Sequence, residues 1–207
     1  MIISITGTLG AGKGTIVEYL ECKGYRHFSA RDLLVAELDN RGLEHNRENM
    51  LQTANDLRAT YGPSYIAEQL LAMAKEDSSN AVIESIRSIG EARFLKEHGA
   101  KLWAVDADPQ LRYNRVQGRA SVTDRVSFDE FRQHEAAEFA NTDPAKNNLR
   151  GVMMMADDTF TNNGTPMELF KQVEHALMRC EEGTDSAYTP PGSDAMSDEG
   201  TVDGSSA

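Results

Sequence analysis

The sequence predicts an α/β fold, in which a five-stranded parallel sheet is flanked by helices. Two observations support this prediction. Short apolar runs alternate with longer stretches of helical periodicity along residues 1–180, which is the pattern of repeated strand–helix–strand units. A glycine-rich segment also separates the first apolar run from the first helical stretch. We therefore expect a single α/β domain over residues 1–180.

The predicted strands are short runs with an apolar or alternating pattern. Residues 1–6 read MIISIT, a largely β-branched run that stops at Gly7, as is typical of a buried parallel strand. The other strands are expected at residues 26–29 (RHFS), 80–85 (NAVIES), 101–107 (KLWAVDA) and, running into a turn, 157–164 (DDTFTNNG).

The predicted helices lie between and after these strands. Gly24, Gly42 and Gly99 follow helical stretches at the position where a left-handed residue often ends a helix. Pro63 is expected in the first turn of its helix, where proline is well tolerated. The predicted helices cover residues 13–24, 30–42, 46–62, 63–77, 89–99, 108–119, 127–140, 142–156 and 165–180.

The chain is acidic, with a formal net charge of −12. An acidic protein repels nucleic acid phosphates, so we expect no DNA or RNA partner. The charge is uneven, because residues 181–207 hold seven acidic residues and no Lys or Arg. The same segment is rich in Gly, Ser and Pro, and this composition predicts an acidic disordered tail.

Cysteine usage and hydropathy predict the compartment. Cys22 and Cys180 do not form a CxxC motif, which favours reduced thiols in a reducing cytosol. The sequence has no apolar run near the roughly 18–20 residues of a membrane span. Because the predicted first strand begins at Met1, we expect no secretory signal. We therefore expect a soluble cytoplasmic protein, monomer or homodimer, with no membrane partner.

The segment GTLGAGKGT, residues 7–15, predicts a phosphate-binding loop. The spacing of Gly7, Gly12 and Lys13 is typical of a loop whose backbone N–H groups surround phosphate oxygens. The helix that follows adds the positive end of its dipole. Gly10 and Gly12 let the backbone approach an anion closely, and Lys13 supplies a positive charge. A glycine-rich turn without a ligand is the alternative.

This loop resembles the GxxGxGKGT loop of adenylate kinase and related nucleoside monophosphate kinases, which also have Gly and then Thr after the Lys. The resemblance implies a P-loop kinase that uses ATP and Mg²⁺, with acceptor-binding helices near residues 30–77 and a short lid near 115–128. Because Gly14 has no hydroxyl, Mg²⁺ would be held mainly through water and phosphates, with Thr15 nearby. The implied ATP-binding residues of the loop are Gly7, Gly10, Ala11, Gly12, Lys13, Gly14 and Thr15.

The segment FSARDLL, residues 28–34, resembles the S-T-G-D-x-x-R stretch that starts the acceptor-binding helix of those kinases. Ser29 and Asp32 match the motif. Arg31 replaces its Gly, and Val35 stands where the family has Arg, so Arg31 is the candidate substitute. The resemblance thus implies acceptor contacts by Ser29, Arg31 and Asp32. For Asp32, a helix N-terminal carboxylate is the structural alternative.

The segment VIESIRS, residues 82–88, resembles the V-I-D-G-x-x-R stretch of the same kinases. Glu84 replaces the Asp, Ser85 replaces the Gly, and Arg87 comes one place early, a spacing similar to that of an archaeal kinase-like group related to dephospho-CoA kinase. The resemblance implies that Glu84 binds Mg²⁺ through water and that Arg87 is catalytic and meets the acceptor phosphate. Arg58 is a further acceptor candidate, although an exposed helix arginine is the alternative.

The segment RYNRVQGRASVTDR, residues 112–125, holds four arginines. Arg115 and Arg119 are four residues apart and so share a helix face, where they repel each other unless an anion joins them. The cluster resembles the lid arginines of monophosphate kinases, which implies catalytic roles for Arg115, Arg119 and Arg125. Arg112 is expected on a solvated face.

The segment ADDTFTNNG, residues 156–164, resembles the C-terminal strand and turn of dephospho-CoA kinase. The resemblance implies that Asn163 borders the adenine of ATP, although Asn-Gly is also a simple turn signal. The expected function is ATP-dependent phosphoryl transfer to a small phosphorylated acceptor, a (deoxy)nucleoside monophosphate. The alternatives are a dephospho-CoA kinase-like activity and a nucleotide-binding regulatory module without turnover.

Overall fold

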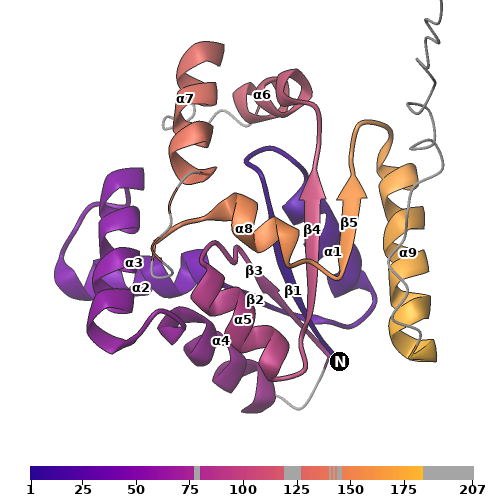
Figure 1. Cartoon of the computed structure of the whole chain (residues 1–207), viewed down its shortest axis with the longest axis horizontal. Helices are drawn as coiled ribbons and strands as arrows, with labels where there is room; N and C mark the ends of the chain where they lie inside the picture. The colour runs from indigo at the N-terminus through magenta and orange to yellow at the C-terminus, as the bar shows by residue number, and fades with distance from the viewer. Residues whose placement is uncertain (77–79, 119–126, 140, 142, 144–145, 184–207) are drawn as a thin grey trace, which may run out of the picture.

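The five strands of the described chain form one parallel sheet in the order β2-β3-β1-β4-β5 (Figure 1). The computed structural model describes residues 1–76, 80–118, 127–139, 141, 143 and 146–183. The strands are β1 Ile2–Gly7, β2 Arg26–Ser29, β3 Ala81–Glu84, β4 Lys101–Asp106 and β5 Asp158–Thr161. The predicted fold class, a parallel α/β sheet of the P-loop kinase type, is therefore confirmed.

Helices lie on both faces of the sheet and beyond its carboxyl edge, where Figure 1 shows α6 and α7. Their bounds are α1 Lys13–Cys22, α2 Ala30–Arg41, α3 Arg47–Tyr61, α4 Tyr65–Glu76, α5 Ile89–Glu97, α6 Pro109–Gln117, α7 Phe128–Phe139, α8 Leu149–Met154 and α9 Pro166–Glu182. Within the described residues, no helix is both long enough and apolar enough to span a membrane.

Two apolar clusters hold the helices onto the sheet. On one face, α1 and α9 pack against side chains such as Ile5 and Trp103. On the other face, α2 to α5 and α8 pack against side chains such as Ile83 and Leu102. Successive residues of a strand point to opposite faces, so one continuous apolar run can serve both clusters.

The order of the strands fixes where a ligand can bind. β1 lies at the centre, with β3 on one side and β4 on the other, and Ile5 pairs with Glu84. The connections that leave β1 and β3 therefore meet at the carboxyl edge of the sheet. In open parallel sheets this change of direction is the usual position of the ligand crevice.

Local sequence signals explain most element boundaries. Ser29 caps α2, because its side chain accepts hydrogen bonds from the backbone N–H groups of Arg31 and Asp32. Gly42, with a φ of 67°, ends the same helix in the left-handed conformation.

Two helix predictions differ from the structure. Pro63 lies in the turn before α4 rather than in its first turn. Among the described residues of the helix predicted over 142–156, the helical ones are those of α8, Leu149–Met154, which begins after the Asn148 cap. The lid segment 119–126 and the acidic tail beyond Gly183 lie outside the described residues. The domain limits expected from the sequence stay a prediction.

Candidate functional site

The loop between β1 and α1 is shaped by glycines that no other residue could replace without strain. Gly10 has a φ of 80°, and a Cβ there would lie 2.5 Å from the carbonyl oxygen of Arg112. Gly12 has a φ of 107°, and its Cβ would collide with the side-chain amide of Asn162. The loop backbone at Gly10 and Gly12 therefore lies directly against Arg112 and Asn162. This places the loop at the N-terminus of α1, where backbone N–H groups and the helix dipole favour an anion.

Polar side chains of the loop itself and of two other segments hold the loop in place. The Thr8 hydroxyl donates to Asp106 Oδ1 at 2.5 Å. The Asn162 amide donates to the carbonyl oxygen of Ala11 at 2.8 Å. The Lys13 ammonium donates to the carbonyl oxygens of Gly7 and Thr8 at 2.8 and 2.9 Å. The loop is thus held in place before any anion binds, which lowers the entropy cost of binding.

Glu84 ends β3 beside the loop. Its Oε2 atom lies 3.2 Å from Nε2 of His27 on the neighbouring strand β2. Burial alone would raise the pKa of Glu84, but the contact with His27 and the charge of Lys13 outweigh burial and lower it. The same contact is the main reason that the pKa of His27 is raised. Glu84 is therefore an ionised carboxylate at the edge of the anion-binding loop.

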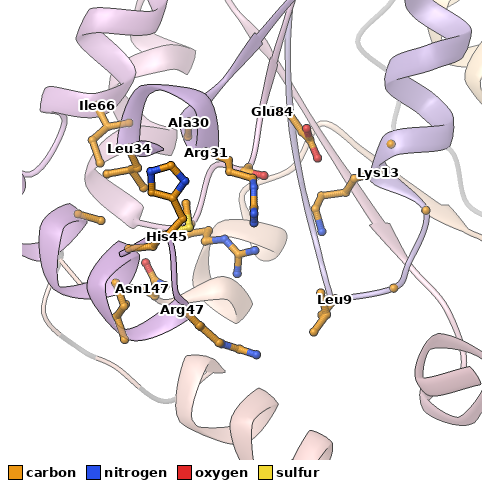
Figure 2. Close-up of a pocket in the computed structure, with 18 of the residues that line it drawn as sticks. Leu9, Lys13, Ala30, Arg31, Leu34, His45, Arg47, Ile66, Glu84 and Asn147 are labelled. Carbon is orange, nitrogen blue, oxygen red and sulfur yellow. The ribbon is translucent and has the colours of Figure 1, made fainter. Parts of the chain in front are cut away.

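A cavity of about 540 Å³ connects the loop with helices α2, α3 and α4. Figure 2 shows Lys13 and Glu84 pointing into one part of this cavity, with Arg31 reaching toward it from α2. The loop residues that line it are Leu9, Gly10, Gly12, Lys13, Gly14 and Thr15. The far half has aliphatic walls from Leu34, Met50, Leu51, Ala54 and Ile66, together with Asn147.

The cavity is electropositive inside an acidic protein. Five Lys or Arg residues line it, namely Lys13, Arg31, Arg47, Arg58 and Arg87, and His45 lines it as well. Among the described residues, the acidic side chains that line the same cavity are Glu18 and Glu84. The whole chain carries a formal net charge of −12. A local excess of positive charge against this background favours a strongly anionic ligand.

Arg58 is held by a buried ion pair rather than exposed on its helix. Only 4% of Arg58 and 1% of Glu91 is exposed, and Arg58 Nε lies 2.9 Å from Glu91 Oε1. Arg58 Nη1 also donates to Oδ1 of Asn147 at 3.3 Å. These contacts orient the guanidinium at the cavity wall and rule out the alternative of a solvated helix arginine.

Glu91 also organises the turn that carries Arg87. Its Oε2 atom accepts hydrogen bonds from the backbone N–H groups of Arg87 and Ser88, at 3.3 and 3.2 Å. Ser88 in turn caps α5, so that Ser88 and Glu91 form a capping box. Sequence reasoning missed Glu91, although the S-x-x-E spacing at residues 88–91 was a readable signal.

Arg112 was expected on a solvated face, and this expectation is wrong. Only 3% of Arg112 is exposed. Its guanidinium donates to the carbonyl oxygens of Ala107 and Leu9, at 2.8 and 3.4 Å, and forms an ion pair with Glu135 of α7. Arg112 therefore ties the phosphate loop to α6 and α7. A charge pattern read along one helix could not reveal a partner that comes 23 residues later in the chain.

The predicted site residues divide into three groups. Those that line the cavity are Gly10, Gly12, Lys13, Gly14, Thr15, Arg31, Arg58, Glu84 and Arg87. Those that are described by the structure but do not line the cavity are Gly7, Ala11, Ser29, Asp32, Arg115 and Asn163. Arg119 and Arg125 lie outside the described residues. Sequence reasoning missed His45, Arg47 and Asn147, which come from segments without a recognisable motif.

Two residues of the second group, Arg115 and Asn163, form hydrogen bonds with segments that neighbour the loop. Arg115 Nη2 donates to the carbonyl oxygen of Asn162 at 2.9 Å. Its Nη1 atom is buried and has no hydrogen-bond partner within the part of the chain that the structure describes. Asn163 Oδ1 accepts a hydrogen bond of 2.7 Å from the backbone N–H of Asp108. In this structure both residues therefore contact the protein scaffold rather than the cavity.

Comparison with known proteins agrees with this geometry. The sequence profile of a family described as an AAA domain matches residues 3–139. A shikimate kinase from Acinetobacter baumannii, solved in complex with shikimate, has a similar structure with a TM-score of 0.56 and 14% identity, covering 87% of this chain and 94% of that one. At this identity the likeness concerns the fold, which is that of P-loop small-molecule kinases. A P-loop domain implies that a nucleotide binds.

Two relatives match most of the chain. A UPF0200 protein of Thermococcus gammatolerans is 29% identical over 181 residues, which cover 84% of this chain and 92% of the relative. A UPF0200 protein of Methanococcus maripaludis strain C7 is 30% identical over 181 residues, covering 85% of this chain and 95% of the relative. The match over residues 3–139 shows that the chain contains an AAA domain. The 30% identity to the second relative over most of both chains shows that this chain belongs to the UPF0200 family.

Proposed function

We propose that this protein transfers the γ-phosphoryl group of ATP to the phosphate of a small acceptor, and that the acceptor is a (deoxy)nucleoside monophosphate. One observation carries the proposal: a single cavity joins the phosphate loop to a second group of cations on α2, α3 and the turn after β3. A protein that only bound ATP would need no cations beyond the phosphate loop and its Lys13. The second group suits a second anion in line with the first.

The loop half suits the phosphates of ATP. Its N–H groups and the helix N-terminus bind the phosphate oxygens, while the Lys13 ammonium, which bridges the carbonyls of Gly7 and Thr8, moves onto them. Asp106, which accepts from the Thr8 hydroxyl, and Asn162 hold the loop, so that these donors are already in place. Preorganised donors of this kind stabilise the charge that develops during transfer.

The residues present also fit Mg²⁺. The ion prefers oxygen ligands and usually binds through one or two carboxylates together with substrate phosphates and water. Glu84 is an ionised carboxylate beside the loop, and Thr15 offers a hydroxyl in the same cavity. The described residues contain no cluster of three metal-binding side chains, which agrees with a metal held mainly by phosphates and water. Mg²⁺ would neutralise phosphate charge and align the γ-phosphoryl group.

The acceptor half suits an anion with an apolar body. Arg31, Arg58 and Arg87 supply guanidinium groups. One guanidinium can donate hydrogen bonds to two phosphate oxygens at once. The aliphatic side chains of α2 to α4 offer a surface for a nucleobase. During transfer the bond between the γ-phosphorus and the bridging oxygen breaks, and ADP leaves. A new bond forms to an oxygen of the acceptor phosphate, and no covalent enzyme intermediate is needed.

The test is a panel of acceptors with MgATP, with ADP and the phosphorylated acceptor both quantified. The panel contains AMP, CMP, dCMP, UMP, dTMP and dephospho-CoA, with shikimate and gluconate as acceptors that lack a phosphate. We expect transfer to at least one nucleoside monophosphate and none to shikimate or gluconate. Transfer to dephospho-CoA alone would replace the proposed acceptor. Binding of MgATP without transfer to any acceptor would contradict the proposal and favour a regulatory module.

A further inference from the structure

Ser85 directly follows Glu84 at the end of β3, and its backbone conformation is unusual. Its φ is 73°, and among the residues that the structure describes it alone has a positive φ without being glycine. Side chains with a Cβ are disfavoured in this region, whereas glycine adopts it freely. A glycine would therefore be the expected residue here. Its replacement by serine requires a separate reason.

The surrounding main chain imposes this conformation. The N–H groups of Ser85 and Ile86 both donate to the carbonyl oxygen of Ile5, at 3.1 and 3.2 Å. The Thr6 hydroxyl donates to the carbonyl oxygen of Ile86 at 2.8 Å. Strained residues persist where the structure around them is fixed in this way, and they concentrate at functional sites. All of these bonds involve the backbone of residues 85 and 86, so a glycine at position 85 could make them equally well.

The side chain itself has no structural task that the described residues reveal. Ser85 is partly exposed and lines the cavity, one residue after Glu84 and two before Arg87. Within the described part of the chain, its hydroxyl has no hydrogen-bond partner. A hydroxyl can donate one hydrogen bond and accept two. It therefore brings a hydrogen-bonding group to the cavity that a glycine would lack.

We infer that Ser85 is a substrate-binding residue whose hydroxyl donates a hydrogen bond to a phosphate oxygen of the acceptor. The turn that carries Ser85 also carries Arg87, and Glu91 joins this turn to Arg58 in the acceptor half. An anion held by these arginines would meet the hydroxyl at the same wall. This inference rests on the proposed function and assigns a further contact within that site.

The test compares Ser85→Gly with Ser85→Ala, because both remove the hydroxyl but only the glycine relieves the backbone strain. The probe is inorganic phosphate, titrated by calorimetry after the phosphate loop has been saturated with Mg²⁺ and the non-hydrolysable ATP analogue AMP-PNP. We expect both variants to bind phosphate about tenfold more weakly than the wild type, since a hydrogen bond to a charged group is lost. The Tm of Ser85→Gly should equal or exceed that of Ser85→Ala.

Two results would overturn the inference. One is an unchanged phosphate Kd in Ser85→Gly with the wild-type Tm or higher, which would make the hydroxyl a solvated group without a ligand. The other is a wild type that binds no phosphate under these conditions. The proposed function can fail while this inference holds. That would be the case if the Ser85 variants lose phosphate affinity but the wild type transfers no phosphoryl group to any acceptor of the panel.

Discussion

The two halves of the cavity are built in different ways. The phosphate loop is one contiguous segment, shaped by glycines with positive φ and held by single polar contacts with Asp106 and Asn162. The acceptor half is assembled from α2, α3, the turn after β3 and Asn147, which are far apart in the sequence. Under the proposed function, backbone groups would hold the anion in the first half, whereas side-chain cations would hold it in the second.

In the phosphate loop, we expect the residues that bind the ligand to contribute little to the stability of the fold. In the acceptor half, we expect the same residues to serve both binding and stability. Lys13 donates to the carbonyl oxygens of Gly7 and Thr8 and lines the cavity, so we expect its loss to affect the ligand more than the fold. Arg58 is paired with Glu91 in the interior, so a change on either side leaves a buried charge alone. The predictions below test this contrast, beginning with the largest expected effect.

Glu91→Ala should lower stability the most. Removing one member of a buried ion pair costs about 3–5 kcal/mol, which corresponds to a fall in Tm of about 10 °C for a domain of this size. The measurement is thermal unfolding followed by circular dichroism. Glu97→Ala is the matched control, because Glu97 is exposed on the same helix α5 and should change stability by no more than about 0.5 kcal/mol.

The double variant Arg58→Ala/Glu91→Ala sharpens this prediction. If the cost arises from a charge left alone, the two losses will be less than additive. A Tm for Glu91→Ala that matches the Glu97→Ala control would show that the buried pair does not hold the acceptor half together.

Lys13→Ala should lower the kcat/KM of phosphoryl transfer about 100-fold or more, since a positive charge aimed at the transferring group is lost. Its Tm should stay within about 3 °C of the wild type. Lys171→Ala, on the exposed side of α9, is the control and should leave both quantities unchanged. A loss of stability as large as that of Glu91→Ala would remove the proposed contrast between the two halves.

Glu84→Gln should raise the Mg²⁺ concentration needed for half-maximal activity about tenfold, because an ionised carboxylate that orients the metal's water becomes neutral. A magnesium titration at saturating ATP measures this shift. Glu76→Gln, exposed at the end of α4, is the control. An unchanged magnesium requirement would mean that Glu84 takes no part in binding Mg²⁺ and serves only in the contact with His27.

Gly14→Ala should have the smallest effect and stabilise the fold by about 0.5–1 kcal/mol. Gly14 lies in the first turn of α1, and a Cβ there would meet no atom within 4 Å. Gly12→Ala should instead destabilise the protein, because of its φ of 107° and the collision with Asn162. Urea unfolding of both variants provides the comparison. Equal stabilities would mean that the tight geometry of the loop is not needed for folding.

The difference between the halves also explains what the sequence could predict. The phosphate loop and its neighbours β1 and α1 follow from one contiguous pattern of apolar residues, glycines and Lys13, and the predicted parallel sheet is confirmed. The buried state of Arg112 depends on Glu135 and Leu9, and that of Arg58 depends on Glu91 and Asn147. No local pattern specifies such pairs, because they form only when distant elements pack together.

A crossed binding experiment tests most directly whether the cavity holds two separate anion sites. The Kd of Mg²⁺–AMP-PNP, and then the Kd of inorganic phosphate at saturating Mg²⁺–AMP-PNP, are measured by calorimetry for the wild type, Lys13→Ala and Arg87→Ala. We expect Lys13→Ala to weaken the nucleotide about 100-fold. Arg87→Ala should weaken phosphate at least tenfold while leaving the nucleotide within about twofold. Equal weakening of both ligands by Arg87→Ala would contradict the two-site cavity.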